Sequence, residues 1–231
     1  MLAKGRDDAK EGTMKINFLG DSITEGAWAI PKGKRYSTLV CQMLGATENN
    51  YGIGGTRIAK QKQLGVGEKD DTDFFTRAQT MDKEADFVFV FGGTNDYGHG
   101  DAAIGSLQDV TRNTFYGALK ALVEYLISVY GKSRLCFILP LHRYNEDNPC
   151  GESKKKEAGY PLSTYVQAEI DVFRYYGVDY LDFGELFPQP TVDTGDALTH
   201  DGLHPNNEGH RLLAEKIVGY LAKKFPQTVQ K

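Results

Sequence analysis

The sequence is short of the features that mark membrane, disulfide-rich or nucleic-acid-binding proteins. Its 231 residues include three cysteines, Cys41, Cys136 and Cys150, whose wide spacing fits neither a metal-binding box nor a disulfide framework. The formal net charge is -4 and the pI about 5.8, so the basic footprint of a nucleic-acid-binding protein is missing. No apolar run reaches the length of a membrane span. We therefore expect neither nucleic acid nor membrane as a partner, and the oligomeric state stays open.

The first 13 residues are charged and lack the apolar core of a signal peptide. Met14 directly precedes the first apolar run, so we expect residues 1–13 to be a disordered leader or a remnant outside the fold. Without a signal peptide, a cytoplasmic location is the default expectation. The rest is 40% hydrophobic and 25% charged, with no internal repeat or low-complexity linker. Residues 14–231 are therefore expected to fold as a single domain with a sizeable core.

Apolar runs typical of strands alternate with amphipathic segments typical of helices. The predicted strands cover residues 15–19, 46–51, 86–91, 134–139 and 178–183. The predicted helices cover residues 36–44, part of 58–84, 108–130, 161–176 and 206–224. This alternation predicts an α/β fold in which helices cover both faces of a five-stranded parallel sheet.

A polar cluster stands at the end of the first predicted strand. Residues 16–19 end at Gly20, and the hydroxyl of Ser22 follows directly. Ligands of open α/β sheets bind at the carboxyl ends of the strands, so Ser22 is a candidate nucleophile. Taken alone, such a segment is more often a simple turn. It is also not the Gly-x-Ser-x-Gly elbow, because Thr24 replaces the second glycine.

Three further polar clusters are predicted at the same edge of the sheet. Residues 52–55 contain three glycines, whose N–H groups can point at an anion or simply form a tight turn. Asn95 follows strand 86–91 and offers an amide donor, although turn asparagines commonly bond their own backbone. Asp201 stands three residues before His204, a spacing that lets the carboxylate reach Nδ1 of the ring. Their joint placement indicates a catalytic site.

Four blocks in order make the chain resemble the SGNH hydrolases, also called the GDSL family. Residues 20–24 (Gly-Asp-Ser-Ile-Thr) match the first block, 50–55 the second, 93–96 the third and 201–205 the last. The matches span about residues 15–210. The resemblance implies a flavodoxin-like three-layer α/β/α fold with strand order 2-1-3-4-5, and it implies neither a cofactor nor a metal.

The same resemblance implies the catalytic roles. Ser22 is the nucleophile, His204 the general base and Asp201 the carboxylate that orients the base. The implied activity is hydrolysis of carboxylic esters through an acyl-enzyme.

The resemblance also implies an oxyanion hole. Its donors are the Ser22 N–H, a glycine N–H and the side-chain amide of Asn95. The family glycine is the last of its block and falls on Gly55, with Gly54 as the neighbouring alternative.

The substrate is less constrained, because the family covers carbohydrate O-acetyl esters, lysophospholipids, thioesters and aryl esters. Polar loops with aromatic side chains suit a sugar better than a long acyl chain, so we favour acetylated carbohydrates as the small-molecule substrates. The expected substrate contacts are Asp21, Trp28, Gly54, Tyr97, Arg143 and Tyr144. Trp28, the only tryptophan, could equally be a packing residue. Residues 141–159 form a polar insertion that we expect to act as a lid or substrate-selecting loop.

Two alternatives come from other classes of protein. A metal-dependent hydrolase would use His200 and His204 with nearby aspartates, but Pro205 disfavours the helical geometry of such a pair. A non-catalytic glycan-binding protein could keep the fold without turnover. The intact set of motif residues argues against that second alternative.

Overall fold

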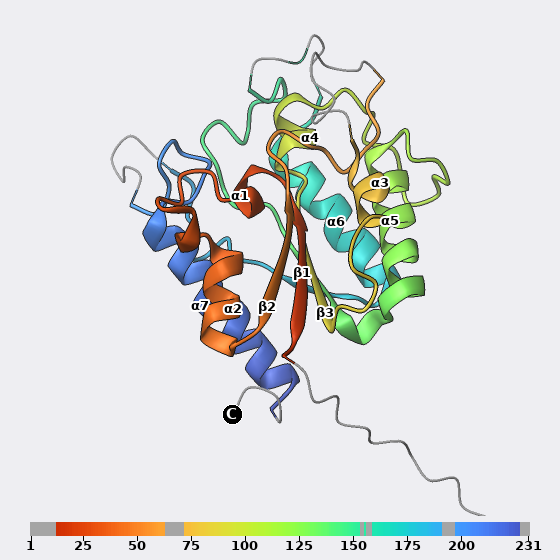
Figure 1. The fold of residues 1–231 in the computed structure, drawn as a ribbon. Coiled ribbons are helices and arrows are strands. Elements are labelled where there is room, and N and C mark those ends of the chain that lie inside the picture. Colours follow the sequence, from red (N-terminus) through yellow and green to blue (C-terminus); the bar gives the residue numbers. More distant parts are fainter. Residues whose placement is uncertain (1–12, 63–71, 153–154, 156–158, 191–196, 227–231) are drawn as a thin grey trace, which may run out of the picture.

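The computed structural model describes residues 13–62, 72–152, 155, 159–190 and 197–226. Its five strands are all parallel and form one sheet in the order β2-β1-β3-β4-β5 (Figure 1). They are β1 (Lys15–Gly20), β2 (Thr47–Gly52), β3 (Phe87–Phe91), β4 (Leu135–Ile138) and β5 (Asp179–Leu181). The predicted five-stranded parallel sheet and its 2-1-3-4-5 order are confirmed.

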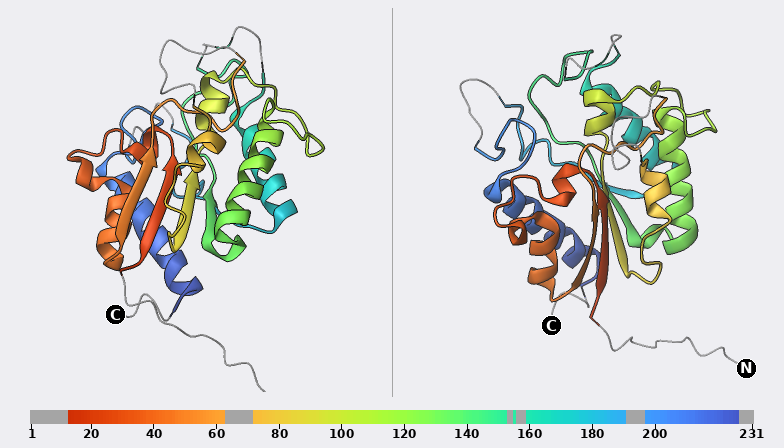
Figure 2. Two further views of the ribbon diagram at one scale, coloured as in Figure 1. Left: turned by 45° about the vertical axis from the view of Figure 1, so that its right-hand side comes forward. Right: turned by 45° about the horizontal axis from the view of Figure 1, so that its top comes forward.

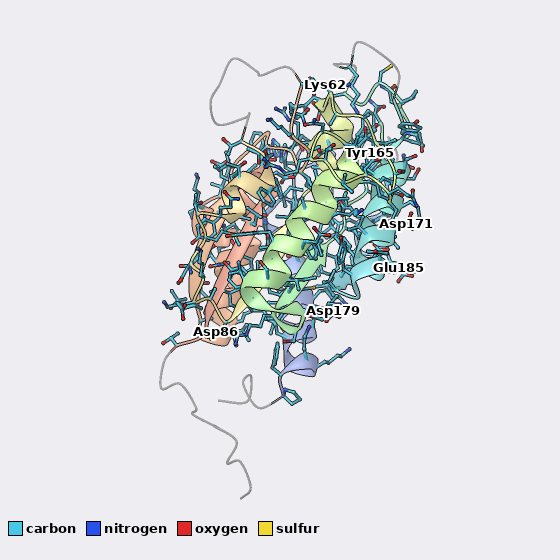
Figure 3. The ribbon with its side chains drawn as sticks, turned by 90° about the vertical axis from the view of Figure 1, so that its right-hand side faces the viewer. Lys62, Asp86, Tyr165, Asp171, Asp179 and Glu185 are labelled. Carbon is cyan, nitrogen blue, oxygen red and sulfur yellow. The ribbon has the colours of Figure 1, made fainter. Side chains whose placement is uncertain are left out.

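Helices cover both faces of this sheet, which gives three layers (Figure 2). One face carries α2 (Tyr36–Leu44) and α7 (Asn207–Lys224). The other face carries α3 (Phe74–Ala78), α5 (Phe115–Tyr130) and α6 (Leu162–Tyr176). Figure 3 views the side of the molecule on which α5 and α6 lie, and it labels Tyr165 and Asp171 on α6. None of the described helices is both long and apolar enough to cross a membrane.

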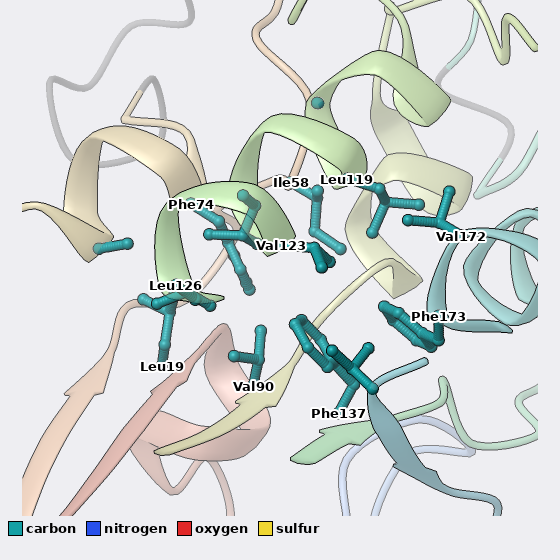
Figure 4. Close-up of a cluster of buried hydrophobic side chains, with 14 of the residues drawn as sticks. Leu19, Ile58, Phe74, Val90, Leu119, Val123, Leu126, Phe137, Val172 and Phe173 are labelled. Carbon is teal, nitrogen blue, oxygen red and sulfur yellow. The ribbon is translucent and has the colours of Figure 1, made fainter. Parts of the chain in front are cut away.

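Alternate strand residues point to opposite faces of the sheet and enter two hydrophobic cores. Leu19, Val90 and Phe137 pack beneath α3, α5 and α6 (Figure 4). Phe18 and Phe89 point the other way, stack on each other at 5.6 Å and pack with α2 and α7. Burial on both faces explains why the strands read as nearly continuous apolar runs.

Two predicted helices are shorter than expected. Within the described part of residues 58–84, only α3 is an α-helix, and residues 63–71 lie outside the described chain. The helix predicted at 108–130 begins at Phe115, because the Thr114 side chain caps it by accepting the Gly117 N–H at 3.2 Å. The sequence between 108 and 113 forms turns instead.

Two short helices were not predicted. α1 (Ser22–Glu25) follows β1 directly, and α4 (Thr94–His99) follows β3. Residues 97–99 lie in the second half of α4. Helices of four and six residues are too short to show a 3.6-residue apolar period. Both helices lie at the carboxyl ends of the strands, where the polar clusters were expected (Figure 1).

Candidate active site

Ser22 is the first residue of α1 and stands one residue beyond Asp21, the N-cap. The chain reaches this position through a tight turn at Gly20. A Cβ atom at Gly20 would come within 2.0 Å of Thr24 Oγ1 and 2.8 Å of the Phe91 carbonyl oxygen. Only glycine therefore allows the short connection from β1 to α1 that places the Ser22 hydroxyl at the strand end.

Asp201 and His204 stand on a small hairpin that precedes α7. Thr199 and Pro205 form an antiparallel bridge, and the His200 N–H donates to the His204 carbonyl at 2.8 Å. Asp201 Oδ1 accepts the backbone N–H of His204 at 2.8 Å. The other carboxylate oxygen, Oδ2, lies 2.8 Å from His204 Nδ1. The carboxylate thus binds both the backbone and the ring of the same histidine.

The hairpin and α1 meet at the two predicted catalytic side chains. Ser22 Oγ lies 2.9 Å from His204 Nε2, although 182 positions separate them in the sequence. Partial burial of Asp201 opposes its ionisation, but hydrogen bonds from His204 outweigh that burial and hold its pKa below the usual range. An ionised Asp201 accepts Nδ1–H and leaves Nε2 free to accept the serine proton. The structure brings the three predicted residues into one hydrogen-bonded chain.

The glycine turn after β2 lies beside Ser22. A Cβ added to Gly54 would stand 3.5 Å from Ser22 Cβ, so the two segments are in close approach. The Gly54 N–H donates to Glu25 Oε2 at 2.8 Å and is therefore occupied. Gly55 has a φ of 76°, and its N–H has no partner among the described residues. Of the two glycines, Gly55 has the N–H that is available to a ligand.

Asn95 lies in the first turn of α4 and is only 4% exposed. Its Nδ2 donates to the Thr56 carbonyl at 3.1 Å, which ties the amide to the segment that follows the glycine turn. Gly93, the N-cap of α4, has a φ of 94°, a conformation that residues other than glycine rarely adopt. An amide nitrogen carries two hydrogens, so Asn95 keeps one for a ligand.

A buried arginine that the sequence analysis missed joins the strand ends. The Arg77 guanidinium donates to the carbonyls of Gly20 (2.8 Å) and Tyr51, and to Thr56 Oγ1 (2.6 Å). Burial lowers the pKa of Arg77 to about 10, so it remains charged at neutral pH. These bonds fix the ends of β1 and β2 and the glycine turn relative to each other. The only sequence signal was a lone Arg in a polar, weakly helical stretch.

Two buried carboxyl groups also stabilise the turns around Ser22. Asp96 accepts the backbone N–H groups of Ile58 (2.8 Å) and Ala59 (2.9 Å), and burial raises its pKa to about 7. Asp21 accepts the Ile23 N–H at 3.0 Å, and burial raises its pKa to about 6. Both groups bind the backbone of the site.

Three of the side chains predicted to contact the substrate are buried in this structure and are hydrogen-bonded within the fold. Asp21 is 1% exposed and caps α1. Tyr97 is fully buried, and its hydroxyl donates to the carbonyls of Asn145 and Asn148. Arg143 is 5% exposed and binds Thr94 Oγ1 at 2.9 Å and Glu152 at 2.7 Å. These side chains support the loops of the site from within.

Trp28 and Tyr144 are placed differently, because both are exposed and both contact the hairpin. Trp28 is 44% exposed, and its ring stacks on His200 with the centroids 3.5 Å apart. Tyr144 is 53% exposed, and its backbone N–H donates to the Gly202 carbonyl at 2.8 Å. Two exposed aromatic rings thus flank the hairpin that carries His204.

The described part of the 141–159 segment is bound to the rest of the fold. Besides the Arg143 and Tyr144 contacts, the Glu152 N–H donates to the Gly98 carbonyl at 2.9 Å. Lys155 Nζ lies 2.9 Å from the Tyr165 hydroxyl on α6, a residue labelled in Figure 3. Residues 153–154 and 156–158 lie outside the described chain, and the lid role of this segment stays a prediction.

No group of three or more His, Cys, Asp or Glu side chains in the described part of the chain is arranged to hold a metal ion. His200 stacks on Trp28 and His204 contacts Ser22, so the two histidines of the metal alternative have different partners.

Comparison with known proteins identifies the family. Residues 18–212 match the model of the GDSL-like Lipase/Acylhydrolase family. No curated protein gives a significant sequence match.

Solved structures share the fold over nearly the whole chain. A protein from Lactobacillus plantarum is 29% identical with a TM-score of 0.75, covering 93% of this chain and 99% of its own. Est24, a carbohydrate acetylesterase from Sinorhizobium meliloti, is 17% identical with a TM-score of 0.65, covering 92% of this chain and 100% of its own. A two-domain esterase active on acetylated mannans, CEX, is 22% identical with a TM-score of 0.61, covering 95% of this chain and 51% of its own.

The family match covers most of the chain and includes all four blocks of the predicted resemblance. The chain therefore belongs to the GDSL-like lipase/acylhydrolase family and is a carboxylic ester hydrolase.

Proposed function

We propose that the protein is a serine esterase that removes short acyl groups, in particular acetate, from carbohydrates. The observation that carries the catalytic part is the continuous hydrogen-bonded chain from Ser22 Oγ to His204 Nε2 (2.9 Å) and from His204 Nδ1 to Asp201 Oδ2 (2.8 Å). This is the arrangement of nucleophile, general base and orienting carboxylate that acyl transfer requires.

In the proposed reaction, His204 Nε2 takes the hydroxyl proton of Ser22 as Oγ attacks the ester carbonyl. A bond forms between Oγ and the carbonyl carbon, and the carbonyl oxygen becomes an oxyanion. When the intermediate collapses, the protonated His204 gives its proton to the leaving alcohol. Water then repeats the attack on the acyl-enzyme, with His204 again as base, and releases the acid and Ser22. Asp201 stays ionised and stabilises the imidazolium throughout.

The proposed oxyanion donors are the N–H groups of Ser22 and Gly55 and the second amide hydrogen of Asn95. Ser22 is the first helical residue, so its N–H cannot bond within α1. The occupied Gly54 N–H supports Gly55 as the glycine donor. Each such donor typically contributes about 10²–10³ in rate when it is aimed at the developing charge.

Two kinds of observation support an acetylated sugar as the substrate. Trp28 and Tyr144 are exposed beside the hairpin, and aromatic faces combined with polar neighbours suit the mixed surface of a sugar ring. The fold is shared with a carbohydrate acetylesterase and with an esterase active on acetylated mannans.

A chain-length series tests the proposal. The purified protein is assayed with p-nitrophenyl esters from acetate to decanoate, followed by acetylated xylose and mannose oligosaccharides, lysophospholipid and acyl thioesters. We expect kcat/KM to be highest for acetate and to fall as the acyl chain lengthens, with acetate released from the oligosaccharides. A preference for chains of eight or more carbons would replace the acetylesterase assignment with a lipase-like one. Binding of glycans without any turnover would favour the glycan-binding alternative.

A further inference from the structure

The surface hairpin that carries His204 and the start of α7 lie against the segment that follows α1. That segment, residues 26–31, contacts the hairpin and the start of α7 in several places. Trp28 stacks on His200, and Asn207, the first residue of α7, binds Ile30. These contacts lie outside the catalytic chain of hydrogen bonds and have no role in the reaction described above.

Asn207 binds both backbone groups of one residue. The Ile30 N–H donates to Asn207 Oδ1 at 3.0 Å, and Asn207 Nδ2 donates to the Ile30 carbonyl at 2.8 Å. A single exposed side chain thus satisfies two backbone groups that no helix or strand includes. Because Asn207 is three residues after His204, this pair of bonds fixes the far end of the hairpin.

The stack between Trp28 and His200 lies at the start of the hairpin. His200 is joined to His204 through the bond from the His200 N–H to the His204 carbonyl, 2.8 Å long. The residue whose ring stacks on Trp28 is therefore bonded directly to the backbone of His204. Trp28 itself has a φ of 61°, a conformation that is unfavourable for a non-glycine residue and persists only where the surroundings impose it.

A buried histidine completes the connection beneath the surface. His210 is fully buried on α7, accepts the Tyr36 N–H on Nδ1 at 3.2 Å and lies 3.4 Å from the Ala27 carbonyl through Nε2. Burial lowers its pKa to about 4, so the ring is neutral and its one proton is on Nε2. His210 therefore anchors the base of the 26–31 segment to α7.

We propose that Trp28, His200 and Asn207 form a clamp that positions His204 against Ser22. The clamp rests on the proposed role of these two residues as base and nucleophile. His200 and Asn207 are positioning residues, because they act through the hairpin and not on the substrate. Trp28, whose exposed face is also proposed to meet the sugar, belongs to the clamp through its stack on His200. Holding reacting groups in place is worth a large factor in rate, and a displacement of about 1 Å can cost about 10²-fold.

The sequence itself supplies the probe. Trp28 is the only tryptophan, so the intrinsic tryptophan emission of the intact protein reports on the surroundings of this one side chain, of which the His200 ring is a part. Loss of the stack changes these surroundings and therefore the intensity and wavelength of the emission. The state of the clamp can thus be measured independently of activity.

The test compares N207A, H200A, H200F and Q167A with the wild type. Gln167 is the control, because its exposed amide side chain likewise makes a hydrogen bond, to Asp171 at 2.7 Å, but within α6 and away from the hairpin. For each protein, the Trp28 emission, the melting temperature, and kcat and KM on p-nitrophenyl acetate are measured. We expect N207A and H200A to change the emission and to lower kcat about 10-fold with KM unchanged. H200F restores the stack and most of kcat, and Q167A leaves every value as in the wild type.

The outcomes separate the clamp from the catalytic proposal. Changed emission with wild-type kcat in N207A and H200A would overturn the clamp while leaving the esterase proposal intact. Unchanged emission in N207A would also overturn it, because Asn207 would then not hold the 26–31 segment. A wild type that turns over no ester would overturn the proposed function, and the positioning role of the clamp with it.

Discussion

Ser22 and the groups around it are held by buried hydrogen bonds, whereas His204 and Asp201 stand on a surface hairpin. Arg77 and Asp96, which fix the turns on the Ser22 side, are 6% and 3% exposed. On the other side, the side chains of His204 and Asp201 are 20% and 40% exposed. Damage to the buried half should therefore cost stability as well as rate. Damage to the hairpin should cost rate with little loss of stability.

The largest loss of rate is expected from a substitution in the exposed hairpin. His204→Ala removes the general base, so we expect kcat on p-nitrophenyl acetate to fall by about 10⁴-fold or more. Because His204 is partly exposed and packs in no core, the melting temperature should stay close to that of the wild type. Steady-state kinetics and calorimetry on the same sample measure both. A large fall in melting temperature would show that His204 contributes to the stability of the fold, and it would contradict the difference between the two halves of the site.

Asn95→Ala should cost both rate and stability, because Asn95 is a proposed oxyanion donor and is also bound within the buried half of the site. We expect kcat to fall by about 10²–10³ through loss of one oxyanion donor. The Thr56 carbonyl also loses its partner, which costs about 1 kcal/mol of unfolding free energy. Urea denaturation measures this loss of stability beside the loss of rate. An unchanged kcat would remove Asn95 from the oxyanion hole.

Arg77→Met tests the buried half directly. The two backbone carbonyls and the hydroxyl that Arg77 binds would be left without this partner, so we expect a loss of roughly 2–4 kcal/mol in unfolding free energy. Chemical denaturation is the measurement, with Arg134→Met on an exposed residue as the control. Equal stability of the two variants would contradict the view that Arg77 fixes the strand ends.

A pH-dependent effect, on stability and not on rate, is expected from a buried carboxyl group on α6. Glu169 is 1% exposed, and burial raises its pKa well above the usual value of 4.5. A raised pKa in the folded state means that Glu169 supports folding fully below pH 4.5 and that this support is lost as the pH rises. Glu169→Gln removes this dependence, so its stability relative to the wild type should increase by up to ~1.4 kcal/mol per pH unit above pH 4.5. Melting curves from pH 5 to 8 measure it, and a constant difference would contradict the assignment.

Much of the fold could be predicted from the sequence, because long helices and buried strands show a regular apolar pattern. The run 86–91 lies between two helix layers and could hardly be anything but a central strand. α1 and α4 could not be predicted in the same way, because turns at Gly20 and Gly93 define them and not an apolar period.

The candidate catalytic residues could be predicted from the sequence, whereas the residues that hold them in place could not. Ser22, Asp201 and His204 stand at strand ends or a helix entry, so their convergence followed from topology. Tyr97 and Arg143 also follow strand ends in the sequence, but their side chains are buried and bind partners that no local pattern indicates. Arg77 and Asn207 carry no local signal, because their partners are backbone groups far away in the sequence.

The most direct test of the account is the intact mass of the protein after treatment with a fluorophosphonate, compared with the Ser22→Ala variant. An activated Ser22 attacks the phosphorus atom and displaces fluoride, so we predict that a single adduct forms on the wild type and none on the variant. The absence of an adduct on the wild type, or an equal adduct on both proteins, would contradict the assignment of Ser22 as the nucleophile.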